Sequence, residues 1–380
     1  MNSSYDTDVL IVGAGPTGLT LAASLAQRGI SATLVDRQAA GANTSRAGVV
    51  NARSLEVLER VDVARRLVKE GIQAARFNIR DRARTLTAVD FSTLPTDYPY
   101  SLLVPQSITE RLLLDRLTEL GGSVVRPVSL TTIEQDADGV TATFDDGRVI
   151  RARYAVGADG IHSTVREQAG IGFQGGAYDE SFALADVHLT GDVSPDEVNL
   201  YWATAGLTVI APLPDGSYRV VAPVEDAPEN PSAPFVQQIL DDRGPGGLTV
   251  IDVVWGSRFR VHHRVADTFR AGRLLLAGDA AHVHSPAGGQ GMNLGIQDAV
   301  ALSEALAGVL AGGPDSLLDD YSAARRPIAR DVVAMTDRLT RLATLPRAAR
   351  PLRNALIRVM GRIPKANRAL AWRLSGIVYR

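Results

Sequence analysis

The chain contains no cysteine and almost no lysine. Among its 380 residues there is no Cys, and Lys69 and Lys365 are the only lysines among 40 basic residues. Without cysteine there can be no structural disulfide and no redox-active thiol pair. This composition fits a reducing compartment, so we expect a cytoplasmic protein.

Three further features are missing. No run of 18 apolar residues occurs, so no transmembrane span is expected. The polar start Met1–Tyr5 has no signal-peptide pattern. The net charge of -2 gives no reason to expect nucleic acid as a partner. At 380 residues the chain has room for two domains.

The first informative segment is a dinucleotide-binding fingerprint near the N-terminus. Val9–Val12 is an apolar run of the kind found in a buried parallel strand. Gly13 permits a tight turn, Gly15 lets the backbone approach a pyrophosphate, and Gly18 lets the following helix pack on the strand.

The residues after these glycines complete a strand-helix-strand unit. Leu19–Gly29 supplies the helix, with Gly29 as its stop, and the helix N-terminus offers N–H groups to phosphates. Ser31–Val35 is the second strand. It ends at Asp36, 18 residues after Gly18, which is close to the spacing of a carboxylate that binds an adenosine ribose. Arg37 follows directly.

A second segment, near the C-terminal third, favours FAD over NAD. Leu274–Ala277 is a short buried strand that ends at Gly278 and Asp279. The Asp279 carboxylate can accept hydrogen bonds from a ribityl chain, which NAD lacks. The glycines at 288–291 precede a helix predicted over Met292–Leu310, whose N-terminus can stabilise negative charge on reduced flavin. His282 and His284 have no third ligand nearby, so no metal is expected.

A third segment, Asp159-Gly160, ends an antiparallel meander with hairpin turns at Asp138-Gly139 and Asp146-Gly147. Ser163 is placed to cap a short helix. Nearer the N-terminus, Ser107 and Glu110 have the spacing of a capping box for a helix over about 107–120.

Together, the three segments resemble the class A flavoprotein monooxygenases, the para-hydroxybenzoate hydroxylase family. Within that family they are most similar to hydroxylases that tailor aromatic polyketides and antibiotics. The resemblance covers about residues 5–340 and stops where larger members continue into a thioredoxin-like domain.

The resemblance implies an α/β fold with a Rossmann-like FAD-binding domain, an antiparallel-sheet substrate domain and a helical C-terminal tail. We expect the FAD-binding domain to be discontinuous, with the substrate domain inserted in it. The predicted FAD-binding residues are 1–72, 101–175 and 265–340, the substrate domain is 73–100 and 176–264, and the basic tail is 341–380.

The resemblance also assigns roles to individual positions. Asp279 meets the ribityl chain, Met292 and Asn293 meet the flavin ring, and Asp159 lies near the pyrophosphate. Arg46, in the loop Asn43–Ala47, reaches the cofactor, and so does Gln106. The predicted cofactor-binding residues are Gly13, Gly15, Pro16, Thr17, Gly18, Asp36, Arg37, Arg46, Gln106, Asp159, Asp279, Gly289, Gly291, Met292 and Asn293.

In the resembling family the substrate lies between the antiparallel sheet and the flavin. Pro286 and Ala287 are expected to face flavin and substrate. Tyr201, Trp202 and Trp255 are aromatic candidates for the pocket. Because side chains alternate along a strand, at most one of Tyr201 and Trp202 can point inward, and Trp202 is the residue that we select.

The chemistry implied by the resemblance belongs to the cofactor. NADPH or NADH reduces FAD, which takes up O2 as a C4a-hydroperoxide and hydroxylates an electron-rich aromatic small molecule. No catalytic side chain is assigned. The missing cysteines exclude flavin disulfide reductases, and the two lysines lie far from the cofactor segments, unlike the lysine of flavin halogenases. The alternatives are an FAD oxidase or dehydrogenase that does not use NAD(P)H, and a flavin-binding accessory protein that does not hydroxylate.

The last segment of the chain is basic. Residues 338–380 contain eleven Arg or Lys and no acid, and Leu352, Leu356, Val359 and Ile363 recur at helical spacing. This pattern favours helices that pack on the protein's own body. The alternative is a contact with an acidic partner or an anionic surface.

Overall fold

The computed structural model describes residues 5–41 and 47–380. Its first large sheet has eight strands, and a central run β18-β11-β1-β2-β8 in which all neighbours are parallel. Apolar residues with little exposure fill the central strands, as expected for a parallel sheet covered on both faces. The strands are β1 (Thr7–Val12), β2 (Ala32–Val35), β8 (Val124–Val125), β9 (Leu130–Gln135), β10 (Val140–Phe144), β11 (Val149–Gly157), β17 (Arg270–Ala271) and β18 (Leu274–Leu276).

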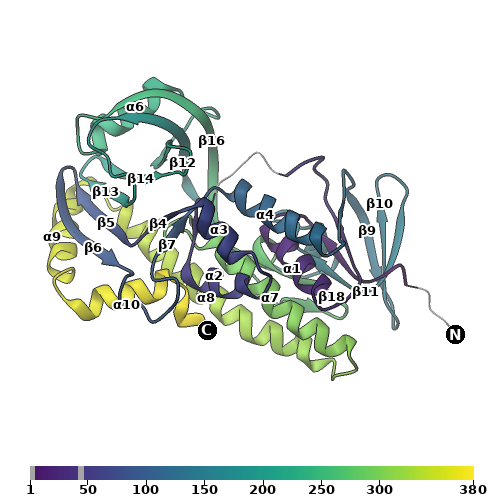
Figure 1. The fold of residues 1–380 in the computed structure, drawn as a ribbon. Coiled ribbons are helices and arrows are strands. Elements are labelled where there is room, and N and C mark those ends of the chain that lie inside the picture. The colour runs from purple at the N-terminus through teal and green to yellow at the C-terminus, as the bar shows by residue number, and fades with distance from the viewer. Residues whose placement is uncertain (1–4, 42–46) are drawn as a thin grey trace.

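Helices from distant parts of the chain pack around this sheet. Helix α1 contacts both α4 and α7, so the first glycine-rich segment and the glycines at 288–291 meet through the helices that follow them (Figure 1). Strands β9, β10 and β11 form the predicted meander, and Ser163 caps α5 by accepting a hydrogen bond from the Arg166 N–H. The helices are α1 (Pro16–Ala26), α2 (Ala52–Glu59), α3 (Ala64–Glu70), α4 (Gln106–Glu119), α5 (Thr164–Gln168), α7 (Gly291–Leu310) and α8 (Ser316–Ala343).

The second large sheet also has eight strands, in the order β19-β16-β12-β15-β14-β13-β5-β6. Its neighbours are antiparallel except for the β13–β5 pair. Helix α6 (Ala233–Arg243) packs on one face of it. The strands are β5 (Arg76–Asp81), β6 (Arg84–Asp90), β12 (Phe173–Thr190), β13 (Val198–Ala203), β14 (Gly206–Pro212), β15 (Tyr218–Val224), β16 (Thr249–Ala266) and β19 (His282–Val283).

Short elements link the two sheets. Strands β3 (Val49–Val50), β7 (Ser101–Leu103) and β4 (Ile72–Ala74) form a three-stranded sheet, and η1 (Gly278–Ala280) follows β18. At the C-terminus, α9 (Arg350–Met360) and α10 (Pro364–Leu374) contact the edge strand β6 (Figure 1). Two short helical turns, η2 (Arg347–Ala349) and η3 (Ile377–Tyr379), flank them.

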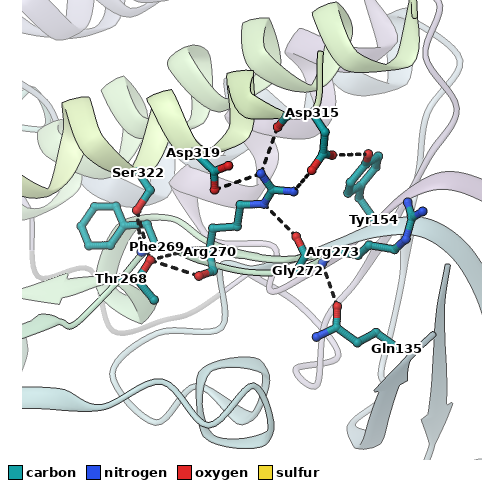
Figure 2. A network of polar contacts seen from close by, with 10 residues as sticks. All are labelled: Gln135, Tyr154, Thr268, Phe269, Arg270, Gly272, Arg273, Asp315, Asp319 and Ser322. Atoms are coloured by element: carbon teal, nitrogen blue, oxygen red, sulfur yellow. Dashed lines mark hydrogen bonds and ion pairs between the residues drawn. The ribbon is translucent and has the colours of Figure 1, made fainter. Parts of the chain in front are cut away.

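A polar network fixes the start of α8 against the first sheet. Figure 2 shows the Arg270 side chain between Asp315 and Asp319. The Tyr154 hydroxyl, from β11, donates to Asp315 over 3.1 Å. Arg270 also holds the pKa of the Asp315 carboxyl below its usual value by hydrogen bonding. Strands β17 and β11, which pair with β18 on either side, are thereby tied to the start of α8.

The predicted fold class is confirmed: a mixed α/β protein with parallel and antiparallel sheets and C-terminal helices. Two local predictions are wrong or incomplete. Pro105, not Ser107, is the N-cap of α4, and no side chain caps it; Glu110 instead accepts from the Gln106 amide over 2.7 Å. Helix α6 was not predicted, although Ser232 caps it. No helix in residues 5–41 and 47–380 is long and apolar enough to cross a membrane.

Candidate functional site

Two glycines of the first segment are required by packing. Gly13 has φ +105°, and a Cβ there would lie 2.3 Å from the Ala158 carbonyl oxygen. A Cβ at Gly18 would lie 1.9 Å from the carbonyl oxygen of Gly13. Neither backbone neighbour can move away easily, so any side chain at these positions would force the turn open.

Gly15 differs from these two glycines. Its φ of -74° suits any residue, and no heavy atom of the described residues lies within 4 Å of a Cβ built there. Leu19 N–H donates to the Gly15 carbonyl in the first bond of α1, so the N–H groups of Thr17 and Gly18 precede the helical ladder. Pro16 at the first helical turn has no N–H to lose. This open, donor-lined space fits a pyrophosphate.

Asp36 lies at the end of β2 and faces the same turn. Its Oδ2 accepts from the Ala14 N–H over 2.6 Å, and its Oδ1 accepts from the Gln38 N–H over 2.7 Å. Each oxygen keeps a further lone pair for a ribose hydroxyl. Arg37, beside it, is exposed.

The three sequence segments converge on one place. Ala158 N–H donates to the Val12 carbonyl over 2.8 Å, and Ala277 N–H donates to the Gly157 carbonyl over 3.0 Å. Thr17 packs against both Gly278 and Gly295, where a Cβ would lie 2.4 and 2.3 Å from its Oγ1. The first segment therefore contacts the second and the third directly.

Asp159 stabilises the segment that follows the meander. Its Oδ2 accepts from the N–H groups of Thr164 and Val165, over 2.8 and 3.3 Å. Burial raises the pKa of the Asp159 carboxyl. The carboxyl thus organises the start of α5 next to the Gly13 turn. Asp279 lies in η1 with an exposed side chain, one residue after Gly278, which has φ +62°.

Gly289 and Asn293 make hydrogen bonds within the protein at the start of α7. Gly289 N–H donates to the Pro286 carbonyl over 2.9 Å, so it closes a turn of the protein itself. The Asn293 side chain is fully buried and holds the backbone of Val49 and Asn51, over 2.9 and 2.8 Å. The Gly289 N–H and the Asn293 side chain are therefore both engaged by the protein itself.

Gly291 and Met292 provide the free start of α7. The first ladder bond runs from the Leu294 N–H to the Gln290 carbonyl, so the N–H groups of residues 291–293 precede it. A Cβ at Gly291 would meet nothing closer than the His284 ring, at 3.9 Å. The helix N-terminus is therefore accessible to an anionic group, such as the pyrimidine edge of reduced flavin.

Gln290 is a site residue that the sequence analysis missed. It is buried, and its Nε2 donates to the carbonyls of Gly288 and Leu374 over 2.7 and 3.0 Å. The Asn51 amide approaches its Oε1 at 3.4 Å. Gln290 thus joins the loop before α7, the start of α2 and the last turn of α10. The sequence feature that could have indicated this role is the position of Gln290 directly before Gly291.

The two histidines lie in protein hydrogen bonds. His282 Nε2 is 2.5 Å from Asp298 Oδ2, and Arg325 donates to the other oxygen over 2.6 Å. Burial alone would raise the pKa of Asp298, but Arg325 and His282 outweigh it and hold the pKa below its usual value. Burial lowers the pKa of His284 to about 4, so its ring is neutral at physiological pH.

A buried ion pair lies on the second sheet where it meets the loop before β3. Arg219 on β15 pairs with Asp186 on β12 through two hydrogen bonds of 2.8 Å. Arg219 also donates to the Ala47 carbonyl over 3.0 Å. Gln106 contacts the same residue, since its Oε1 accepts from the Ala47 N–H over 3.3 Å. This ion pair was not predicted, because nothing in the sequence next to an arginine in a strand indicates its partner.

Tyr201 and Trp202 lie on opposite faces of β13, as the alternation required. Tyr201 packs in the cluster beneath α6. Trp202 packs with Ile79, Leu86 and Ala343 on the other face, under the C-terminal helices, and only 5% of it is exposed. Trp255 lies on β16 opposite Asp186. Pro286 and Ala287 are half-buried in the loop before α7, whereas Arg46 lies outside the described residues.

These features define a class of protein. Three features lie at one junction of two sheets: a glycine turn with the free start of α1, a carboxylate placed to bind a ribose, and the free start of α7. The two helix starts, Pro16 and Gly291, are 275 positions apart in sequence. The space at Gly15 fits the pyrophosphate of FAD, and the start of α7 fits its flavin. The arrangement is that of a flavoprotein.

Comparison with known proteins agrees with this class. Residues 6–336 match the family described as an FAD binding domain. The chain is 39% identical to 6-methylpretetramide 4-monooxygenase of Streptomyces rimosus over 90% of its own length, and it spans 63% of that enzyme. It therefore covers less than two thirds of this relative.

Solved structures show the same fold. p-Nitrophenol 4-monooxygenase PnpA from Pseudomonas putida DLL-E4 superposes with a TM-score of 0.86 at 27% identity, covering 96% of each chain. The Diels-Alderase PyrE3 of pyrroindomycin biosynthesis superposes with a TM-score of 0.84 at 31% identity, covering 98% of this chain and 80% of that one. The chain belongs to the FAD-binding family of flavin-dependent aromatic monooxygenases, and FAD is its cofactor.

Proposed function

We propose that this protein is an NAD(P)H-using hydroxylase of an electron-rich, polycyclic aromatic small molecule of the polyketide type. The observation that carries the proposal is the free N-terminus of α7 beside the half-buried loop at Pro286 and Ala287. A helix start at this position can stabilise the negative charge that reduced flavin acquires. The similarity to 6-methylpretetramide 4-monooxygenase supports the substrate class.

Bound FAD would supply the redox chemistry, in which NADPH or NADH provides two electrons, one oxygen atom of O2 enters the substrate and the other leaves as water. The chain supplies binding and orientation. Thr17, Gly18 and Asp36 would hold the adenosine diphosphate part, and Asp279 would hold the ribityl chain. The Arg219–Asp186 pair ties the covering sheet to Ala47, which helps to keep water out of the site.

One alternative has a specific observation in its favour. PyrE3, named a Diels-Alderase, has the same fold, so a related chain can carry a different activity. A non-hydroxylating flavin-binding role is therefore the second candidate function.

Ligand-stimulated reduction separates the two functions. A hydroxylase should oxidise NADPH or NADH slowly alone and faster with a phenolic polycycle, and it should release some hydrogen peroxide when the ligand fits poorly. If neither nucleotide reduces the bound FAD with any member of a polycyclic phenol panel, the non-hydroxylating role is favoured.

A further inference from the structure

Helix α9 is inverted with respect to an ordinary surface helix. Its buried face is polar: Arg353 and Asn354 are 3% and 6% exposed. Arg353 donates to the carbonyls of Trp202 and Ala343 over 2.9 and 3.1 Å, and Asn354 donates to the Trp202 carbonyl over 2.9 Å. These hydrogen bonds attach the helix to β13 and to the end of α8.

The outer face of α9 is apolar. Leu352, Leu356, Val359 and Met360 are 76%, 57%, 58% and 46% exposed, and Ile363 follows just after the helix. At roughly 100° per residue, the four helical positions fall within an arc of about 100°. They form one continuous stripe. Such a stripe on a protein surface marks a site of interaction.

Exposed cations lie in the same segment as this stripe. Arg358 lies on the exposed side of α9, and Arg362, Lys365 and Arg368 follow it in sequence, all with exposed side chains. Residues 338–380 contain no acid at all. The apolar stripe of α9, in a segment whose charged side chains are all basic, therefore matches a surface with an apolar interior and anionic headgroups.

A second copy of the chain fits the stripe poorly. Two-fold packing of α9 on itself would bring two basic segments together, with no carboxylate side chain from either segment to compensate. A helix of 11 residues is also only roughly 16 Å long. It cannot by itself supply the roughly 800 Å² per partner of a standard interface.

We propose that α9 is a peripheral membrane-binding element that lies on an anionic phospholipid surface. Its leucines, valine and methionine enter the boundary between headgroups and acyl chains, while the arginines and lysine meet lipid phosphates. The inner polar face remains hydrogen-bonded to β13, so the helix binds without leaving the protein. This inference goes beyond the proposed function, and its test uses no turnover.

The test is co-sedimentation of the full-length, FAD-loaded protein with vesicles. One set contains phosphatidylcholine alone, and the other contains phosphatidylcholine and phosphatidylglycerol in equal parts. The variant Leu352→Ser/Leu356→Ser removes two exposed side chains from the stripe. The matched control Ile251→Ser/Val254→Ser removes two apolar side chains of similar exposure, 57% and 53%, from β16.

We expect the wild type and the β16 control to pellet with the phosphatidylglycerol vesicles, less so at high salt, and to stay in solution with phosphatidylcholine alone. The Leu352→Ser/Leu356→Ser variant should bind at least about tenfold more weakly, with unchanged FAD content and melting temperature. The variant Arg358→Gln/Arg362→Gln should weaken binding and flatten its salt dependence.

Two results would overturn the proposal. One is a wild-type protein that stays in solution with phosphatidylglycerol vesicles. This result would overturn the proposal also if the wild type proved to be a dimer that the Leu352→Ser/Leu356→Ser variant converts to a monomer. The other is equal vesicle binding by the wild type and this variant.

Discussion

Gly15 is the residue at which cofactor binding can be tested without disturbing the fold. Because a Cβ there meets no described atom and φ is ordinary, Gly15→Ala should leave the melting temperature of the FAD-free protein within about 2 °C. The methyl group would occupy the space for the pyrophosphate, so FAD affinity should fall at least about tenfold. Flavin fluorescence titration measures this affinity.

Gly18→Ala is the matched control for that change. Its Cβ would collide with the Gly13 carbonyl, so this variant should lose stability as well as FAD. If Gly15→Ala binds FAD as tightly as the wild type, the pyrophosphate does not lie at this turn.

A second pair of glycines tests the start of α7. A Cβ at Gly291 is accommodated, whereas one at Gly295 would lie 2.3 Å from Thr17 Oγ1 and 3.2 Å from Gly278 Cα. Gly295→Ala should therefore destabilise the protein by about 1–3 kcal/mol. Gly291→Ala should spare stability and slow flavin reduction or weaken FAD binding. Denaturant unfolding and FAD titration of both variants distinguish the two effects, and identical behaviour would refute this account of the helix start.

His284 predicts a pH dependence of stability. Its pKa of about 4 in the folded protein lies below the ordinary value near 6.5 of an unfolded histidine. Between these values the unfolded chain binds a proton that the folded chain does not, so stability falls as pH decreases. The loss from this group should be about 2 kcal/mol between pH 6.5 and 5.

The measurement for His284 is urea unfolding at several pH values with excess FAD. His284→Gln should lose this part of the pH dependence, while His188→Gln, at an exposed histidine, should keep it. If the free energy of unfolding of the wild type and of His284→Gln changed equally between pH 6.5 and 5, His284 would not be the source of this pH dependence.

At the scale of elements, α9 depends on its buried polar face. Arg353→Met removes the side-chain donor to the Ala343 carbonyl and one of the two side-chain donors to the Trp202 carbonyl, so it should cost about 2–4 kcal/mol in the free energy of unfolding. Arg358→Met, on the exposed side of the same helix, should change it by less than about 0.5 kcal/mol. Chemical denaturation of both variants checks this, and equal stabilities would mean that α9 is not held by Arg353.

The strands and helices around the cofactor could be predicted because each carries a local signal. The apolar run at Val9–Val12 and the glycines after it suffice to define β1 and the start of α1. Helix α6 was not predicted because the prolines up to Pro234 favour a loop, although Pro next to a Ser cap is typical of a helix start. For α9, the periodicity of the apolar residues predicted a helix with its apolar face packed on the protein. The structure has the opposite orientation, because the hydrogen bonds of Arg353 hold the other face of the helix against the protein.

At the scale of the whole molecule, the convergence of the three segments was predictable only through the family resemblance. Nothing in the local sequence says that Thr17 packs on Gly278 and Gly295, because such contacts depend on how the helices cross. The Arg219–Asp186 pair and the Gln290 contacts were not predictable for the same reason: their partners come from elements far apart in the chain.

The proposed function requires that this chain transfer one oxygen atom from O2 to an aromatic carbon. The most direct test is turnover with NADPH or NADH under oxygen-18 gas, with polycyclic phenols as substrates, followed by mass spectrometry of the product. The account predicts a hydroxylated product that carries one oxygen-18 atom, and no label when the experiment is repeated with ordinary O2 in oxygen-18 water. A hydroxyl group labelled from water, or an oxidised product without added oxygen, would contradict it.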